Sequence, residues 1–352
     1  EIDRKVYRFM GDAAGYGYLS AVQALQDSSL TDEDISNHRT GLIMGSGGAS
    51  SKDQIDSADI LRTKGLKRIG PYRVTRAMGS TVSACLATSL GIKGINYSIS
   101  SACSTSAHCI GSGMEQIQLD KQDVVIAGGA EAEHWGMTNL FDAMGALSTK
   151  YNDDPKSASR AFDRDRDGFV MGDGAGVLIV EEYEHAKKRN ADILAEIIGY
   201  GSSGDAHHIT SPPDDGNGAE KCILSALNDA KKNPEDIDYI NAHGTSTQVG
   251  DKVEVGCIKK IFSKNLDKVK MSSTKSSIGH LLGASGSVES IYSMLSIKNR
   301  ALPPTLNLVS PISEAEGLDL IPLNSIDHKV DCVLSNSFGF GGTNASLIFK
   351  SI

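Results

Sequence analysis

The sequence predicts an α/β protein, because short apolar runs that suit strands alternate with amphipathic runs that suit helices. The strand-like runs are residues 41–45, 95–99, 124–127, 176–180, 193–198, 238–242 and 332–336. A length of 352 residues allows one large domain or two fused halves. The runs fall into an earlier and a later group, and the later group begins near Ile193. Sequence similarity between the groups is too weak to establish an internal repeat.

Composition narrows the possible functions. With 39% hydrophobic and 22% charged residues the chain matches a globular enzyme, and no apolar run approaches the ~20 residues of a membrane helix. A formal net charge of −9 argues against a nucleic-acid-binding surface. No secretory signal is visible, and the six cysteines are scattered without a CxxC pair, which predicts reduced thiols in a cytoplasmic protein.

Cys103 lies where a predicted strand, residues 95–99, turns into a predicted helix. The helix is indicated by apolar residues at spacings of three and four, namely Ala107, Ile110, Met114 and Ile117. A helix N-terminus offers unpaired N–H groups and a positive dipole end, which favour a thiolate. The small neighbours Ser101, Ala102 and Ser104 leave room for a substrate carbonyl. A buried structural cysteine is the alternative, and this run alone leaves both interpretations open.

Three further motifs follow the cysteine. They are Asn-Ala-His-Gly-Thr-Ser-Thr at residues 241–247, Ser-Thr-Lys-Ser-Ser-Ile-Gly-His-Leu-Leu-Gly-Ala-Ser-Gly at 273–286, and Asn-Ser-Phe-Gly-Phe-Gly-Gly-Thr-Asn at 336–344. With the run around Cys103 they resemble the β-ketoacyl-ACP synthases, condensing enzymes of fatty-acid synthesis in the thiolase superfamily. The resemblance covers essentially the whole chain. Residues 97–119 and 141–151 look most like synthase I.

The resemblance implies a thiolase-like fold, which is a five-layered αβαβα sandwich of two related halves and is usually a homodimer. We expect the halves at residues 1–190 and 191–352, with the nucleophilic cysteine in the first and the paired histidines and the lysine in the second. The family pattern opens with a strand and a Gly-rich turn that would precede Glu1. We therefore expect the first strand of that pattern, which we take to be central in its sheet, to be absent from this sequence.

Claisen condensation requires a nucleophile, an oxyanion hole and donors that stabilise an enolate. By resemblance, Cys103 would hold the acyl group as a thioester. Its backbone N–H and that of Phe340 would form the oxyanion hole. His243 and His280 would face the malonyl thioester, promote decarboxylation and stabilise the enolate.

Other site residues follow from the same resemblance. Lys275 would order the site electrostatically, with Glu254 as its ionic partner. The residues expected to bind the pantetheine arm, with the Gly-rich loop that would gate the two half-reactions, are Thr245, Thr247, Phe338 and Phe340. The residues expected to wall the acyl pocket are Gly48, Met137, Phe141 and, reaching across the dimer, Met78.

The implied activity is that of an acyltransferase, a 3-oxoacyl-ACP synthase whose partner is acyl carrier protein. No metal, nucleotide or redox cofactor is implied. An acidic carrier protein would need a local basic patch, and the candidates are Arg62, Lys64, Lys67 and Arg68. A polyketide-type ketosynthase of the same chemistry and a non-catalytic partner resembling a chain-length factor are the alternatives. Cys103 together with both histidines argues against the second.

Two segments imitate other binding motifs. Residues 163–168 copy the opening of an EF-hand loop, but position twelve is Gly174 rather than a bidentate Glu. Residues 199–204 copy a dinucleotide-binding fingerprint, but the following Pro212 and Pro213 prevent the helix that such a turn must open. Both segments are therefore interpreted as structural.

Overall fold

The computed structural model describes residues 2–352, and the chain forms two compact units. The first unit comprises Glu1–Leu140, Asp173–Asp192 and Leu282–Val288. The second comprises Phe141–Gly172, Ile193–Leu281 and Glu289–Ile352. These units differ from the expected halves because two segments, residues 141–172 and 282–288, are exchanged between them.

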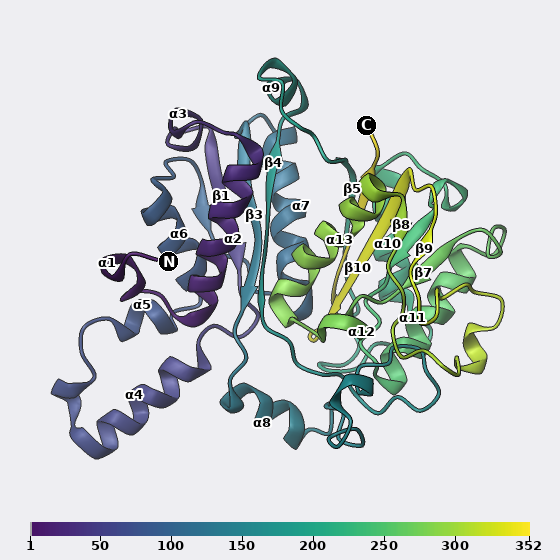
Figure 1. Ribbon diagram of the computed structural model, residues 1–352, viewed down its shortest axis with the longest axis horizontal. Coiled ribbons are helices and arrows are strands. Elements are labelled where there is room, and N and C mark those ends of the chain that lie inside the picture. Colours follow the sequence, from purple (N-terminus) through teal and green to yellow (C-terminus); the bar gives the residue numbers. More distant parts are fainter. Residues whose placement is uncertain (1) are drawn as a thin grey trace. The chain divides into compact units, whose positions relative to one another are not determined.

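The first unit is built on a four-stranded sheet (Figure 1). Its strands, in spatial order, are β2 (Asn96–Tyr97), β1 (Thr40–Gly45), β3 (Val124–Glu131) and β4 (Gly174–Glu181). β1 pairs in parallel with β2 and β3, whereas β4 runs antiparallel to β3. Every residue of β1 and β3 is buried, because helices cover both faces of the sheet. The strand expected at residues 95–99 is shorter than predicted.

Helices pack on the two faces of this sheet (Figure 1). The helices that lie wholly in the first unit are α1 (Arg4–Tyr7), α2 (Asp12–Ser28), α3 (Asp32–Ile35), α4 (Ser51–Lys64), α5 (Arg73–Ala77), α6 (Thr81–Leu90), α7 (Thr105–Gln118) and α9 (Tyr183–Lys188), with 3-10 turns η1 (Leu66–Arg68), η2 (Ala102–Ser104) and η5 (Leu282–Ala284). Helices α2 and α6 share an apolar core with Leu42 and Ile126. On the other face, Gly113 brings α7 close to Val125 and Ala127. The apolar spacing from Ala107 onward therefore predicted α7 correctly.

The second unit is built on a five-stranded sheet. Its strands, in spatial order, are β5 (Glu196–Gly204), β11 (Thr343–Lys350), β10 (Cys332–Gly339), β6 (Tyr239–Asn241) and β7 (Lys270–Ser272), and a separate pair is formed by β8 (Ala301–Leu302) and β9 (Ile326–Asp327). The helices are α10 (Asn217–Asp229), α11 (Gln248–Ile261) and α12 (Lys275–Ile278), with 3-10 turns η3 (Pro155–Ser157), η4 (Pro234–Asp236) and η6 (Ser313–Ala315). Two further helices, α8 (Trp135–Ala143) and α13 (Ser285–Asn299), have residues in both units.

The two sheets repeat one pattern. β7, β6 and β10 are parallel neighbours and β11 is antiparallel to β10, as β2, β1 and β3 are parallel and β4 is antiparallel to β3. The second sheet adds β5 beside β11, while among the described residues no strand pairs with the other side of β4. Our expectation of a central first strand does not match this pattern, because β5, the first strand of its sheet along the chain, lies at the edge.

The segment that imitates a dinucleotide fingerprint is part of β5. A side chain at Gly199 would overlap the backbone of Ala226, and one at Gly201 would overlap that of Cys222. Both contacts are with α10, so these glycines let the strand approach its covering helix closely. The structural interpretation of residues 199–204 is therefore confirmed.

Across the residues that the structure describes, we find no helix with the length and apolar character needed to cross a membrane.

Candidate active site

The nucleophile candidate lies in a strained turn of the first unit. Ala102 has φ of +49°, a left-handed value that is costly for a residue with a side chain. Thr105 secures the turn: its hydroxyl donates to the Ala102 carbonyl at 2.8 Å and accepts the Ser101 N–H at 2.9 Å. Cys103 follows with 9% of its surface exposed, and α7 begins two residues later. The predicted position at a helix N-terminus is thus confirmed.

The thiols of Cys103 and Cys109 differ in burial, with 9% and 0% of the residue exposed. None of the cysteines among residues 2–352 forms a disulfide. Cys109 lies on α7, six residues after Cys103, and complete burial raises the pKa of its thiol to about 12, so that it stays protonated and unreactive. Ser101 and His108 hold each other through an Oγ to Nδ1 contact of 2.7 Å, which further braces the turn before Cys103.

The two histidines of the motifs meet in the second unit. His243 follows β6 and His280 follows α12, and their rings lie 5.4 Å apart and nearly perpendicular, at 86°. The His280 main chain is pinned on both sides, because its N–H donates to Val170 O at 2.7 Å and its carbonyl accepts from Gly172 N at 3.0 Å. The aromatic ring of Phe338 packs 5.8 Å from that of His243.

Both imidazoles are held in the neutral form. Burial lowers the pKa of His243 well below its ordinary value, and the charges of Lys275 and protonated His280 lower it further. Burial, followed by the Lys275 charge, has the same effect on the pKa of His280. Each ring therefore offers one N–H donor and one acceptor nitrogen at neutral pH.

Glu254 shapes the turn that carries His243. Its carboxylate accepts the N–H of His243 at 2.9 Å and that of Gly244 at 2.8 Å, and Asn336 donates to it at 3.4 Å. Burial raises the pKa of Glu254, and the two backbone hydrogen bonds oppose that rise. Glu254 is therefore a positioning group for the His243 main chain.

The ionic partner of Lys275 is Glu289, so the expected pairing with Glu254 was wrong. Lys275 is 1% exposed, and its ammonium binds the Glu289 carboxylate directly in a buried ion pair. Burial raises the pKa of Glu289 to about 7, against the attraction of Lys275. Glu254 is committed instead to backbone N–H groups. Glu289 lies fourteen residues after Lys275 on α13, a spacing that gives no sequence signal.

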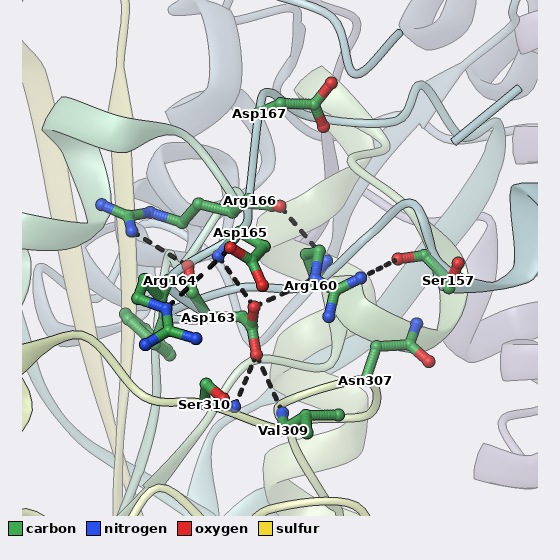
Figure 2. Close-up of polar contacts among 12 residues, drawn as sticks. Ser157, Arg160, Asp163, Arg164, Asp165, Arg166, Asp167, Asn307, Val309 and Ser310 are labelled. Atoms are coloured by element: carbon green, nitrogen blue, oxygen red, sulfur yellow. Dashed lines mark hydrogen bonds and ion pairs between the residues drawn. The ribbon is translucent and has the colours of Figure 1, made fainter. Parts of the chain in front are cut away.

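The segment that imitates a calcium loop is a hydrogen-bonded turn (Figure 2). One oxygen of buried Asp163 accepts the N–H groups of Val309 and Ser310 at 2.9 and 2.8 Å. Its other oxygen accepts the N–H of Asp165 at 2.9 Å and Nε of Arg160 at 3.2 Å. The carboxylate is thus saturated by protein donors, as expected for a structural turn.

The same turn supports the histidine side of the site. Asp251, completely buried on α11, accepts the N–H of Phe162 at 2.7 Å and that of Ser246 at 3.1 Å. Arg166 approaches its carboxylate to 3.2 Å. The loop between His243 and α11 is therefore tied to residues 160–167 by buried polar contacts.

The expected pantetheine residues lie in the second unit. The hydroxyls of Thr245 and Thr247 are 3.0 Å apart at the start of α11. Phe338 is the last residue but one of β10, and Phe340, 36% exposed, lies in the glycine-rich turn to β11. This turn is fastened by hydrogen bonds from Gly341 N to the carbonyl at residue 209 and from the N–H at residue 205 to Gly342 O.

The expected acyl-pocket residues fall into separate groups. In the first unit, a side chain at Gly48 would overlap the end of Met137, so these two positions adjoin. In the second unit, Phe141 packs with its ring 6.2 Å from Phe340 and 5.2 Å from the ring at position 169. Met78 caps α5 and is half-buried in the first unit, and its reach into a partner subunit stays a prediction.

Glu131 is a site residue that sequence reasoning missed. It ends β3 and is 2% exposed. Its carboxylate accepts hydrogen bonds from the Ser46 hydroxyl and from the N–H groups of Gly47, Gly48 and Gly283. Burial raises its pKa, and these four hydrogen bonds oppose the rise. No motif marks this residue, and only the three-dimensional contacts identify it.

With this geometry in place, comparison with known proteins defines the class. Residues 1–186 match the family model described as beta-ketoacyl synthase, N-terminal domain, and residues 194–309 match the corresponding C-terminal domain. The chain therefore belongs to the β-ketoacyl synthase family, and its fold is the thiolase-like α/β fold of that family.

Within this family the chain is similar to particular synthases. It is 52% identical to 3-oxoacyl-[acyl-carrier-protein] synthase 1 of Haemophilus influenzae, over 99% of this chain and 84% of that protein. It is 50% identical to the enzyme of the same name from Escherichia coli K12, over 100% and 85%.

Solved structures agree. A β-ketoacyl synthase from Burkholderia phymatum superposes with a TM-score of 0.93 at 36% identity, covering 99% of this chain and 84% of that one. A type II polyketide ketosynthase in complex with its acyl carrier protein gives 0.92 at 31% identity, covering 97% and 85%.

Proposed function

We propose that this protein is a 3-oxoacyl-ACP synthase of the synthase I type. It condenses an acyl group held on Cys103 with malonyl-ACP, by decarboxylative Claisen condensation, in fatty-acid elongation. The observation that carries the proposal is the pair of neutral histidines backed by a buried lysine, because two converging N–H donors suit an enolate. Identity of about half to synthases of this name favours this reading over a polyketide ketosynthase.

The first half-reaction loads the enzyme. The Cys103 thiolate attacks the carbonyl carbon of acyl-ACP, a new sulfur–carbon bond forms, and the carrier thiol leaves after taking up a proton. The backbone N–H groups of Cys103 and Phe340 stabilise the tetrahedral oxyanion. The braced turn before Cys103 keeps the nucleophile in place, so little reorganisation is needed at this step.

The second half-reaction forms the carbon–carbon bond. Malonyl-ACP binds with its thioester carbonyl facing His243 and His280, and the bond to its carboxylate breaks, releasing carbon dioxide and leaving an enolate. The enolate carbon attacks the acyl carbonyl on Cys103. Collapse of the tetrahedral intermediate expels the thiolate and yields 3-oxoacyl-ACP. The Lys275 charge keeps both rings neutral, which preserves an N–H donor on each.

The carrier protein enters through its prosthetic arm. The adjacent hydroxyls of Thr245 and Thr247 suit hydrogen bonding to the pantetheine amides. The turn that carries Phe340 acts as the gate between the two half-reactions. Exposed basic residues at the end of α4 and in η1 are the proposed docking surface for the acidic carrier, and Lys64 and Arg68 line a surface hollow of about 600 Å³ there.

We further propose a cytoplasmic homodimer in which Met78 completes the partner's pocket.

Mass spectrometry of the intact enzyme incubated with acyl-ACPs of graded length tests the proposal. We expect a mass increase of one acyl group located on Cys103, followed by its loss as 3-oxoacyl-ACP once malonyl-ACP is added. A non-catalytic scaffold would take up no acyl group. A polyketide-type enzyme would extend the chain repeatedly before release.

The lowered histidine pKa values predict an unusual pH profile. A histidine that is neutral in the folded protein gains its proton only well below the ordinary pKa of about 6.5. Decarboxylation of malonyl-ACP should therefore stay level as the pH falls through that value. Folding stability should decline over the same range, because the unfolded chain takes up protons there that the native chain excludes. Carbon dioxide release and thermal unfolding, each measured across pH, check both; a rate inflection at the ordinary histidine pKa would contradict the assignment.

Substitution of Gly48 tests the acyl pocket. We expect Gly48→Met to shorten the longest acyl chain accepted at Cys103, because the new side chain would compete with Met137 for the same space. Overpacking costs roughly 1–3 kcal/mol, which lowers the acylation rate about five- to 160-fold, but only for chains that reach this point. Acylation rates with acetyl-, butyryl- and long-chain ACPs are compared. A uniform loss at every length would show that Gly48 is only a backbone requirement.

A further inference from the structure

The Glu131 carboxylate accepts hydrogen bonds from two segments of the first unit that are far apart in the sequence. Oε1 accepts the Ser46 hydroxyl at 2.7 Å and the Gly48 N–H at 3.2 Å. Oε2 accepts the N–H groups of Gly47 at 2.8 Å and Gly283 at 2.9 Å. All four neighbours are donors, so the ionised carboxylate satisfies every one of them, whereas a protonated acid would place its own O–H against an N–H.

The segments that Glu131 holds lie next to the expected acyl pocket and to the turn of Cys103, or follow His280 in the chain. Gly48 adjoins Met137 in the expected acyl pocket. A side chain at Gly47 would contact the carbonyl of Ala102, the residue immediately before Cys103. Gly283 follows His280 by three residues and lies in η5. The Glu131 carboxylate therefore holds two segments in place. One is residues 46–48, which follow β1 and lie beside the turn that carries Cys103, and the other is Gly283, which follows His280 in the chain.

The surroundings leave this cluster little freedom to relax. A side chain at Gly283 would overlap the backbone of Gly47, and one at Gly129 would crowd the Gly283 carbonyl and the Ser106 side chain. Close packing of this kind transmits a local change to its neighbours instead of absorbing it. The loss of one hydrogen bond at Glu131 should consequently move the peptide that it released.

We propose that Glu131 is a positioning residue that determines acyl-chain specificity, by holding the Gly47–Gly48 backbone at the wall of the acyl pocket. This inference rests on the proposed condensing function and deepens it. Glu131 touches no reacting atom in this assignment; it acts through the two glycine N–H groups and through Gly283.

The isosteric change Glu131→Gln tests the hydrogen bond to Gly48 separately from the hydrogen bond to Gly283. An amide keeps only one acceptor oxygen, so it can serve Gly47 and Gly283 together or Ser46 and Gly48 together. The first orientation loses only one backbone hydrogen bond, because the Ser46 hydroxyl can rotate and accept from the amide while Gly48 cannot. We therefore expect Glu131→Gln to release Gly48 and to keep the anchorage of Gly283. Glu131→Ala releases both segments.

The experiment compares butyryl-ACP with tetradecanoyl-ACP as acyl donors. For Glu131→Gln we expect kcat/KM to fall about tenfold with tetradecanoyl-ACP, as the loss of a hydrogen bond to a charged acceptor implies, and within about twofold with butyryl-ACP. Glu131→Ala should lower both. The matched control is Glu181→Gln, which alters a buried carboxylate at the opposite end of the same strand pair, where Glu181 binds Arg189 and His185.

The outcomes are distinct. A chain-length-dependent loss in Glu131→Gln, absent from the Glu181→Gln control at comparable thermal stability, supports the proposal. An equal loss at both lengths in Glu131→Gln, or the same dependence in the control, would overturn it and leave Glu131 as a structural group. If the wild-type enzyme itself takes up neither acyl group on Cys103, the proposed function fails instead. Rates of Cys103 alkylation by iodoacetamide show whether each variant keeps its nucleophile turn intact.

Discussion

Cys103→Ala is expected to lose condensation completely while keeping its fold. The reaction has no covalent intermediate without the sulfur, and the nearby thiol of Cys109 on α7 is buried with its pKa raised to about 12. Alanine fits the turn, because Cys103 packs at the start of α7 and the bracing hydrogen bonds come from Thr105. Acyl transfer from radiolabelled acyl-ACP to the protein measures the loss, which should reach the detection limit.

The control is Cys109→Ala, which removes a thiol of α7, the helix that follows the Cys103 turn. It should be acylated as the wild type is, with a modest loss of stability from the cavity left in the core. Malonyl decarboxylation is measured in Cys103→Ala as well. Because both histidines remain, this variant should still decarboxylate malonyl-ACP although it cannot be acylated. If Cys103→Ala became acylated at another residue and condensed, the nucleophile assignment would be wrong.

Local sequence signals were sufficient to predict features that depend on residues close together in the chain. The apolar spacing from Ala107 placed α7, and the strand predicted before it placed Cys103 at the turn that precedes this helix. Proline after residues 199–204 argued against a dinucleotide turn, and the missing twelfth ligand at Gly174 argued against a calcium loop at residues 163–168. Both segments prove to be structural, for the physical reasons that the sequence suggested.

Local sequence signals could not predict contacts between residues that lie far apart in the chain. The resemblance implied Glu254 as the ionic partner of Lys275, but Glu254 accepts two backbone N–H groups, and the Lys275 ammonium binds Glu289 instead. Glu131 binds residues 46–48 and Gly283, about 85 and 152 positions away. The grouping of residues 141–172 with the second unit and of residues 282–288 with the first follows from three-dimensional contacts, which a linear reading does not provide.

His243→Ala and His280→Ala are each expected to reduce malonyl decarboxylation about a hundred- to thousandfold, the usual cost of removing one preorganised donor. The two rings lie together in the second unit, 5.4 Å apart, and both are neutral, so we expect each to supply one N–H to the same developing oxyanion. Transfer of the acyl group to Cys103 should suffer less. Its thiolate is favoured by the helix N-terminus and does not require a histidine as general base.

The measurement is a pair of rates on each variant: carbon dioxide release from labelled malonyl-ACP, and acylation of Cys103 by labelled acyl-ACP. His185→Ala is the matched control, because it removes a histidine that lies outside both motifs and binds Glu181. Losses of similar size in both rates would indicate a general base for the thiol, as in a serine–histidine pair. Selective loss of decarboxylation in both variants would instead require the enolate role for each ring. If one variant lost decarboxylation and the other only acylation, the two histidines would divide the half-reactions between them, and the shared oxyanion site would have to be given up.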